Sequence, residues 1–96
     1  MSDIVSVNNV IDRLSREKKS IRCGDVTKLL ESLGFVVRDG TKGGHKIYSY
    51  FGLGDFHGSS FNCGHGKNPE IKPIYVTNII DVLNKYESEI THLLEK

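Results

Sequence analysis

Residues 43–51 read GGHKIYSYF, a glycine pair followed by an alternating pattern that decides how the middle of the chain folds. Glycines let the backbone bend tightly and approach a ligand closely. The alternation predicts a strand over 45–51, with Ile47, Ser49 and Phe51 on the face of His45 and Lys46, Tyr48 and Tyr50 on the other. Histidine suits proton transfer near neutral pH, and the start of a strand holds it within reach of solvent. His45 is therefore the candidate catalytic residue, although a histidine after glycines is on its own more often a bystander.

Two further strands are predicted beside this one. Residues 35–38 form a short strand before the glycine pair, and residues 59–63 form a third strand after a glycine-rich loop. Their order predicts a meander of three antiparallel strands. Tyr48 and Tyr50 share one face of it, where they either stack on unpaired bases or cover the helices as part of the core.

Both ends of the chain are predicted to be helical. Apolar residues at spacings of three and four mark a helix over about 4–18, for which Ser2 or Asp3 is the cap. Pro73 starts a longer helix that runs close to the C-terminus. The apolar stripes are Ile4, Val7, Ile11 and Leu14 in the first helix, and Val76, Ile79, Leu83, Tyr86, Ile90 and Leu93 in the last. The last helix is too long for a small sheet to cover, so the first helix is predicted to pack on its overhang. Pairing in a homodimer is the alternative.

A second helix precedes the strands and completes an α+β chain. It carries a leucine-rich face and runs to Leu33. Gly34 follows where a left-handed, helix-ending residue belongs, and Phe35 can fold back onto the last turn. This combination predicts a sharp stop between the helix and the first strand.

Composition fits one domain over residues 1–96. No apolar run approaches the roughly 18 residues of a membrane span. The first residues lack the basic start and apolar core of a signal peptide, so the expected location is cytoplasmic.

The charges are unevenly distributed along the chain. Residues 1–73 hold eleven Lys or Arg against eight Asp or Glu, and residues 74–96 hold two Lys or Arg against four Asp or Glu. A mildly basic, glycine-rich middle that suits phosphates thus precedes an acidic final helix.

The two cysteines, Cys23 and Cys63, lie on different predicted elements and have no CxxC spacing. In a reducing compartment they are expected to be free thiols. Cys63 with His57 and His65 forms a conceivable metal cluster, but its spacing fits no recurrent zinc pattern. No metal site is expected.

Three segments follow one another in a recognisable order. They are a leucine-rich helix ending in Gly34-Phe35, the Gly-Gly-His strand start, and His65-Gly66-Lys67 followed by Glu70-Ile71-Lys72-Pro73 and a helix. Together they resemble the HicA toxin family, the ribonuclease half of HicA–HicB toxin–antitoxin pairs. The resemblance covers about residues 23–86.

The resemblance implies an α-β-β-β-α fold like a double-stranded-RNA-binding domain, here over a core of residues 20–86. Residues 1–19 then form an N-terminal helical extension and residues 87–96 an extension of the last helix, both of which depart from the family. The family cleaves mRNA without a metal or other cofactor, uses a single histidine, and is silenced by its antitoxin. His45 matches that histidine. Gly43-Gly44 stand where the family usually has Gly-Ser, so a hydrogen bond from the serine hydroxyl is lost.

The residues also suit this chemistry by themselves. Metal-free RNA cleavage needs a base that takes the proton of the ribose 2′-hydroxyl, which then attacks the adjacent phosphate, and histidine suits this role. The charge that develops on the phosphate needs cations or N–H donors. The candidate RNA-binding residues are Gly43, Gly44, Lys46, His65, Lys67 and Lys72. Of these, His65 resembles a histidine that the family often has before the last helix, and Lys72 lies where helix amides favour anions.

Two other functions remain open from the sequence. A non-catalytic RNA-binding module of the same fold would use His45 only to contact phosphate. A protein-interaction domain would dimerise through the long helices and have no affinity for RNA. Fold alone does not choose among these functions.

Overall fold

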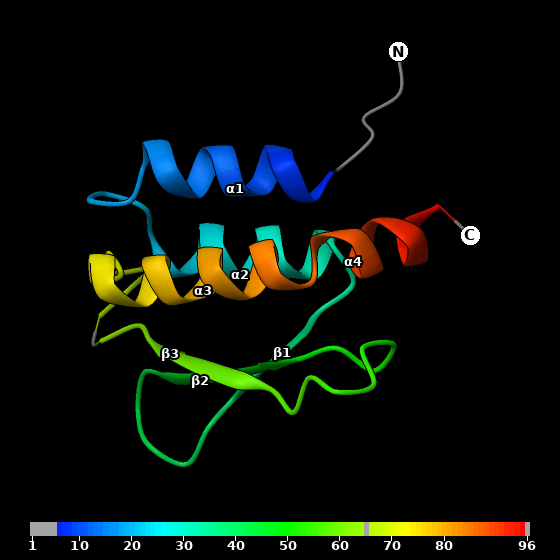
Figure 1. Ribbon diagram of the computed structural model, residues 1–96. Coiled ribbons are helices and arrows are strands. Elements are labelled where there is room, and N and C mark those ends of the chain that lie inside the picture. The colour runs from blue at the N-terminus through cyan, green and yellow to red at the C-terminus, as the bar shows by residue number, and fades with distance from the viewer. Residues whose placement is uncertain (1–5, 65, 96) are drawn as a thin grey trace.

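The computed structural model describes residues 6–64 and 66–95, in which the helices all lie on one side of a three-stranded sheet (Figure 1). The elements in chain order are α1 (Val7–Arg16), α2 (Cys23–Ser32), β1 (Val36–Asp39), β2 (His45–Ser49), β3 (Ser59–Asn62), α3 (Pro73–Lys85) and α4 (Glu87–Leu94). Figure 1 shows α2 and α3 above the sheet and α1 as an outer layer above them. The predicted α+β class is confirmed. Among the helices described, none is long and apolar enough to cross a membrane.

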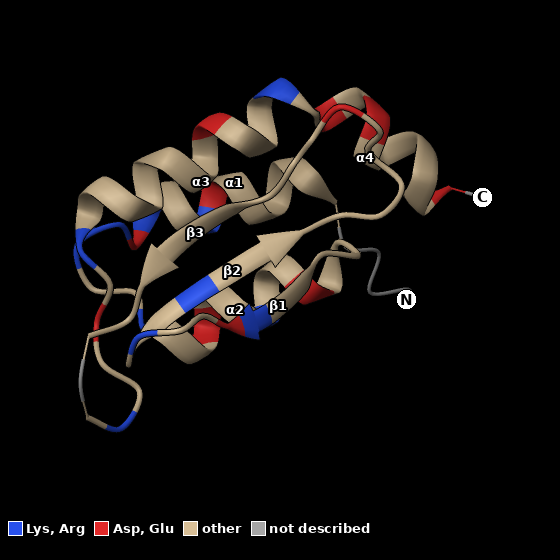
Figure 2. Cartoon of the chain, turned by 90° about the horizontal axis from the view of Figure 1, so that it is seen from below, with Lys and Arg blue, Asp and Glu red and all other residues tan. Residues whose placement is uncertain are grey.

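The strands pair as the predicted antiparallel meander, in the order β1-β2-β3. Tyr48 pairs with Val37 and Ser59 on its two sides, and His45 pairs with Asn62. Because side chains alternate along a strand, buried Tyr48 faces the helices and His45 faces away from them. The uncovered face carries Val36, Arg38, His45, Ile47, Ser49, Ser60 and Asn62, and we call it the open face. Figure 2 looks onto this face, with the helices behind the sheet.

Tyr48 and Tyr50 pack on the core side of the sheet, which confirms the core as one of their two predicted roles and leaves the fully buried Tyr48 no access to a base. Tyr48 is fully buried and packs against the rings of Phe35 and Phe61. The Tyr50 hydroxyl donates a hydrogen bond of 2.7 Å to the Leu33 carbonyl. Burial raises the pKa of both phenols, and at Tyr48 the nearby Ser59 hydroxyl offsets part of that rise.

The end of α2 follows the predicted stop signal. Gly34 has a φ of +105°, which an L side chain rarely adopts, and the Phe35 amide donates to the Leu30 carbonyl at 3.1 Å. A Cβ at position 34 would lie 2.5 Å from the Tyr50 hydroxyl oxygen. Glycine is thus required twice, once for the backbone turn and once to admit the tyrosine that caps the helix.

The start of α1 corrects the predicted cap. Ser6 is the N-cap, and its Oγ accepts a hydrogen bond of 3.1 Å from the Asn9 amide. The helix therefore begins at Val7, because a serine side chain there satisfies an amide that the helix leaves free. The expected caps Ser2 and Asp3, and the stripe residue Ile4, lie outside the described residues.

The predicted single C-terminal helix is wrong, since the chain breaks at Tyr86 into α3 and α4. Tyr86 has φ −107° and ψ 14°, outside the helical values, and its buried ring packs on Phe56 with centroids 5.4 Å apart. The helical hydrogen bonds continue across this residue, from the Tyr86 amide to the Val82 carbonyl and from the Ile90 amide to the Tyr86 carbonyl, and the apolar stripe continues with them. The predicted packing of the first helix on the last is confirmed, because α1 contacts both α3 and α4.

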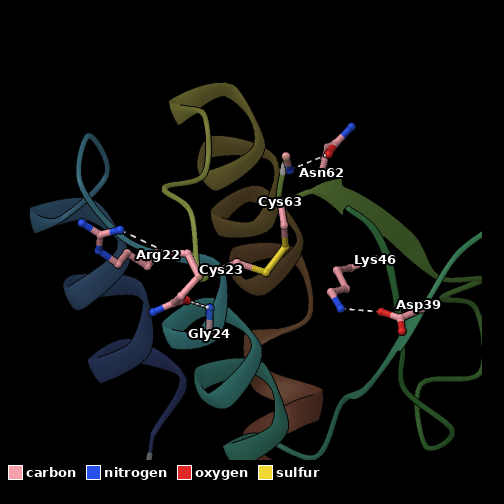
Figure 3. Close-up of a disulfide and its surroundings, with 9 residues drawn as sticks. Arg22, Cys23, Gly24, Asp39, Lys46, Asn62 and Cys63 are labelled. Carbon is pink, nitrogen blue, oxygen red and sulfur yellow. Dashed lines mark hydrogen bonds and ion pairs between the residues drawn. A yellow bond between two sulfur atoms is a disulfide. The ribbon is translucent and has the colours of Figure 1, made fainter. Parts of the chain in front are cut away.

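Cys23 and Cys63 form a disulfide, with Cα atoms 5.4 Å apart, so the expected free thiols are wrong (Figure 3). The reason is topological: β3 returns the chain to the end of the sheet where α2 begins. Cysteines 40 residues apart in sequence therefore meet. Both are buried, and Cys63 is not free to act as a thiolate ligand in the metal cluster considered above. The described residues contain no other group of three or more His, Cys, Asp or Glu that could hold a metal ion.

Replacing both cysteines, as Cys23→Ala with Cys63→Ala, should lower the free energy of unfolding by about 4 kcal/mol, because the bridge closes a long loop in the unfolded chain. Urea unfolding of the two proteins measures this. As a control on the pairing, the denatured wild type should show no reactive thiol before reduction and reactive thiols after it. Reactive thiols in the unreduced protein would contradict the disulfide.

The two core tyrosines should respond differently to loss of the hydroxyl. Tyr50→Phe removes the hydrogen bond to the last turn of α2 and should lower the free energy of unfolding by about 1 kcal/mol. The Tyr48 hydroxyl is buried and has no hydrogen bond of normal geometry within the described residues. Tyr48→Phe should therefore leave stability unchanged or raise it by up to about 1 kcal/mol. A larger loss from Tyr48→Phe than from Tyr50→Phe in thermal unfolding would contradict this assignment.

Candidate functional site

The predicted site residues gather at the end of the sheet where β2 begins and β3 ends. The backbone of His45, the first residue of β2, is held on both sides. Its amide donates to the Lys42 carbonyl at 3.1 Å, and its carbonyl accepts from the Gly40 amide at 2.8 Å. The strand start is therefore a closed turn that fixes the direction in which the imidazole leaves the backbone.

The imidazole of His45 lies on the open face and is half-buried. Its ring packs over Gly40, where any side chain would collide with Cδ2. Among the residues described, none makes a hydrogen bond to either ring nitrogen. The histidine is thus positioned by its backbone and by the space at Gly40, and its nitrogens remain available to a ligand.

Asn62 is the neighbour of His45 that sequence reasoning missed. The two residues are directly paired across β2 and β3, which places their side chains on the same face. Asn62 Oδ1 accepts a hydrogen bond of 2.8 Å from the Gly64 amide, so its side-chain NH₂ group is left to donate elsewhere. Only the register of the sheet brings this amide beside the histidine, and no local motif in the sequence marks it.

Gly44 has a structural role that the sequence did not reveal. Its φ is +80°, and a Cβ there would lie 3.0 Å from the Gly64 amide nitrogen and still closer to the Gly64 carbonyl oxygen. Its own carbonyl accepts a hydrogen bond of 2.6 Å from the Cys63 amide. The turn before β2 is thus packed directly on the end of β3. A serine at position 44, as in the HicA motif, would not fit this backbone.

Lys46 does not lie beside His45 on one surface, although the two residues are adjacent in sequence. Its Nζ forms an ion pair with Asp39 on the helix-facing side of the sheet, next to the disulfide (Figure 3). It lines a pocket of about 550 Å³ between α2 and the sheet, together with Gly44, Gly66 and Lys28. A phosphate bound on the open face at His45 would therefore not lie beside the Lys46 ammonium group, which is on the opposite side of the sheet.

Gly43 and Lys72 are brought together by a second pocket, of about 270 Å³. Asn62, Glu70 and Tyr75 line it as well. Asn62 therefore links this pocket to the open face on which His45 lies. Lys67 is exposed in the loop after β3, and His65 lies outside the described residues.

The loop after β3 is fastened to the start of α2. Asn68 Oδ1 accepts from the Gly24 amide at 2.6 Å, and the Cys23 amide donates to the Pro69 carbonyl at 2.9 Å. Arg22 Nη1 donates to the Asn68 carbonyl at 3.1 Å. The first amides of α2 are thus already occupied by the protein, whereas Lys72 precedes α3 with no side-chain cap on that helix.

The arrangement offers one histidine with free nitrogens, one side-chain amide and a nearby lysine around the Gly43-Gly44 turn. This set can accept a proton and donate hydrogen bonds to an anion that lies at this end of the sheet. No protein-family model, no curated protein and no solved structure matches this chain.

The packing at Gly44 can be tested with a matched pair of glycines. Gly44→Ala should lower the free energy of unfolding by about 2 kcal/mol or more, because it combines an unfavourable φ with a collision against the backbone of Gly64. Gly64→Ala carries a similar φ of +75° but meets no atom within 4 Å, so it should lose only about 1 kcal/mol. Equal losses in urea unfolding would show that contact with Gly64 is unimportant.

Proposed function

We propose that this chain is a HicA-like toxin, a metal-independent endoribonuclease that cleaves mRNA with His45 as its catalytic base. The observation that carries the proposal is the position of His45, at the start of the central strand on an uncovered sheet face, with both ring nitrogens free of hydrogen bonds among the described residues. The order α2-β1-β2-β3-α3, with both helices on one face, agrees with the double-stranded-RNA-binding-domain-like core that the resemblance implies.

In the proposed reaction the ribose supplies the nucleophile. His45 takes the proton of the 2′-hydroxyl, whose oxygen forms a bond to the adjacent phosphorus. The bond from phosphorus to the 5′ oxygen of the next nucleotide breaks, and that oxygen takes up a proton. The products are a 2′,3′-cyclic phosphate and a 5′-hydroxyl. A positioned base of this kind contributes about 10²- to 10⁴-fold in rate.

Stabilisation of the charge that develops on the phosphate is assigned to groups at the end of the sheet where His45 lies. The Asn62 side-chain NH₂ group is left free by the bond from Gly64 to its oxygen. Gly43 is exposed, and its amide donates to no group within the described residues. Lys72 lines the same pocket as both. These three groups replace Lys46, whose ammonium group is already paired with Asp39.

The proposed location is the cytoplasm, where mRNA is the available substrate. Disulfides are uncommon there because cellular thiols reduce them. Cys23 and Cys63 have exposed fractions of only 8% and 4%, which restricts the access of a thiol reductant to the bridge. Burial therefore supports a bridge that persists in the folded protein.

The proposed partner is a HicB-like antitoxin that covers the face bearing His45.

A non-catalytic RNA-binding module is the second candidate, and the glycine at position 44 favours it. The family's serine is absent, and the backbone at Gly44 has no room for one. Dimerisation through the long helices has less support, because the apolar stripes of α1, α3 and α4 are buried against one another within a single chain.

The catalytic assignment is tested by cleavage of a defined mRNA by purified wild type and His45→Ala. The wild type should produce 2′,3′-cyclic phosphate ends in the presence of EDTA, and His45→Ala should be slower by about 10²- to 10⁴-fold. His92→Ala, which alters an exposed histidine on α4, is the matched control and should retain full activity.

Induced expression in a bacterial host provides the second readout. The wild type should arrest growth and degrade mRNA, and His45→Ala should do neither. Cleavage that requires a divalent metal, or that yields 5′-phosphate ends, contradicts the mechanism. Binding of RNA without cleavage by either protein favours the binding module.

A further inference from the structure

A third concave region lies at the other end of the open face from His45. Val36, Arg38, Ser49 and Phe51 line it, where β1 and β2 meet the loop that follows β2. Its volume is about 600 Å³. We call it the β1–β2 groove.

Phe51 is the feature of this groove that the fold does not explain. Its side chain is as exposed as in an extended chain, with a relative accessible area of 103%. The other three phenylalanines all take part in aromatic pairs in the described structure, and Phe51 takes part in none. Val36 beside it is 56% exposed. A large aromatic ring held in water on a turn is suited to stacking on a flat ligand.

The charges around the groove suit an anionic ligand. Arg38 and His57 line it, and no carboxylate does. The open face between the groove and His45 likewise carries no Asp or Glu, since its remaining residues are Ile47, Ser49, Ser60 and Asn62. Asp39, the acid of β1, points to the opposite side and is paired with Lys46. A phosphodiester chain crossing the described strands on this face would therefore meet Arg38 and no carboxylate of the sheet, and the nearest acid in sequence to the groove, Asp55, is exposed in the loop without lining it.

The distance along the face also suits such a chain. His45 and Ser49 are separated by four strand steps, or about 13 Å. This length corresponds to about four stacked nucleotides at ~3.4 Å each. A single strand with its scissile phosphate at His45 thus reaches the groove with a base only a few nucleotides away.

We propose that the open face binds single-stranded RNA from His45 to the β1–β2 groove, with Phe51 stacking on a base and Arg38 contacting a phosphate. This inference rests on the proposed function, because it supplies the substrate-binding surface for cleavage at His45. A protein partner that uses Val36 and Phe51 as apolar contacts is the competing occupant, and it requires no affinity for RNA.

The test measures binding of a fluorescein-labelled 2′-O-methyl RNA of about ten nucleotides. This probe cannot be cleaved through its 2′ oxygen, so binding is read separately from catalysis. By fluorescence anisotropy, Phe51→Ala should weaken binding by about 5- to 150-fold, the range expected for loss of one stacked base. Phe51→Trp should restore it. Leu94→Ala, which removes an exposed apolar side chain from α4, is the matched control and should bind as the wild type does.

The salt dependence of RNA binding by Arg38→Gln provides an independent test. Loss of one phosphate contact should reduce the slope of log affinity against log salt concentration by about 0.7. Phe51→Ala should leave that slope unchanged, because stacking releases no counterion. Both substituted side chains are exposed, so neither variant threatens the fold.

The outcomes separate this proposal from the catalytic one. Failure of the wild type to bind the probe, or equal binding by Phe51→Ala and the wild type, overturns the RNA surface even if mRNA cleavage depends on His45. Binding that depends on Phe51 and Arg38 upholds the surface even if no cleavage occurs, in which case the catalytic proposal alone fails. In the cleavage assay, Phe51→Ala should raise KM and leave kcat unchanged.

Discussion

The contact between the Gly43-Gly44 turn and the end of β3 is the constraint on which the site depends. Gly44 packs directly on the backbone of Gly64 and accepts a hydrogen bond from the Cys63 amide. Cys63 is in turn joined to α2 by the disulfide. Three elements therefore meet at one point, and the direction of His45 follows from it. A larger residue at position 44 would disturb the strand start, the end of β3 and the helix attached to it together.

This constraint also divides the charged groups between two surfaces. Strand alternation sends Lys46 toward the helices, where it pairs with Asp39, and sends His45 toward solvent. The pocket at Lys46 and the pocket at Lys72 share Cys63 and Gly64 as a common wall. Asn62 is paired with His45 on the open face and also lines the Lys72 pocket. Sequence neighbours on a strand make poor partners for a single phosphate, whereas cross-strand neighbours make good ones.

Local signals in the sequence predict most of the fold. The left-handed Gly34, the proline at the start of α3 and the alternation of β2 each act within a few residues, and each prediction is confirmed. The disulfide, the role of Gly44 and the pairing of His45 with Asn62 depend on the sheet register, which no local pattern specifies. The break at Tyr86 is hidden for another reason. The apolar periodicity continues through it, because Leu83, Tyr86 and Ile90 remain buried on both sides of the break.

The side chains on the two faces of the sheet have different roles. Those that face the helices stabilise the fold, and those on the open face are available to a ligand. The aromatic side chains on the helix-facing side pack in the core, where Tyr48 and Phe61 are fully or almost fully buried. Nothing in the packing of the described chain requires Arg38 or Phe51 on or beside the other side, because no helix covers it. The exposed Phe51 adds nothing to a core and exposes apolar area to water, and the neighbouring Arg38 forms no ion pair within the described residues. This is why our proposal assigns them a ligand that is flat and anionic, two properties that a single-stranded nucleic acid has along its whole length.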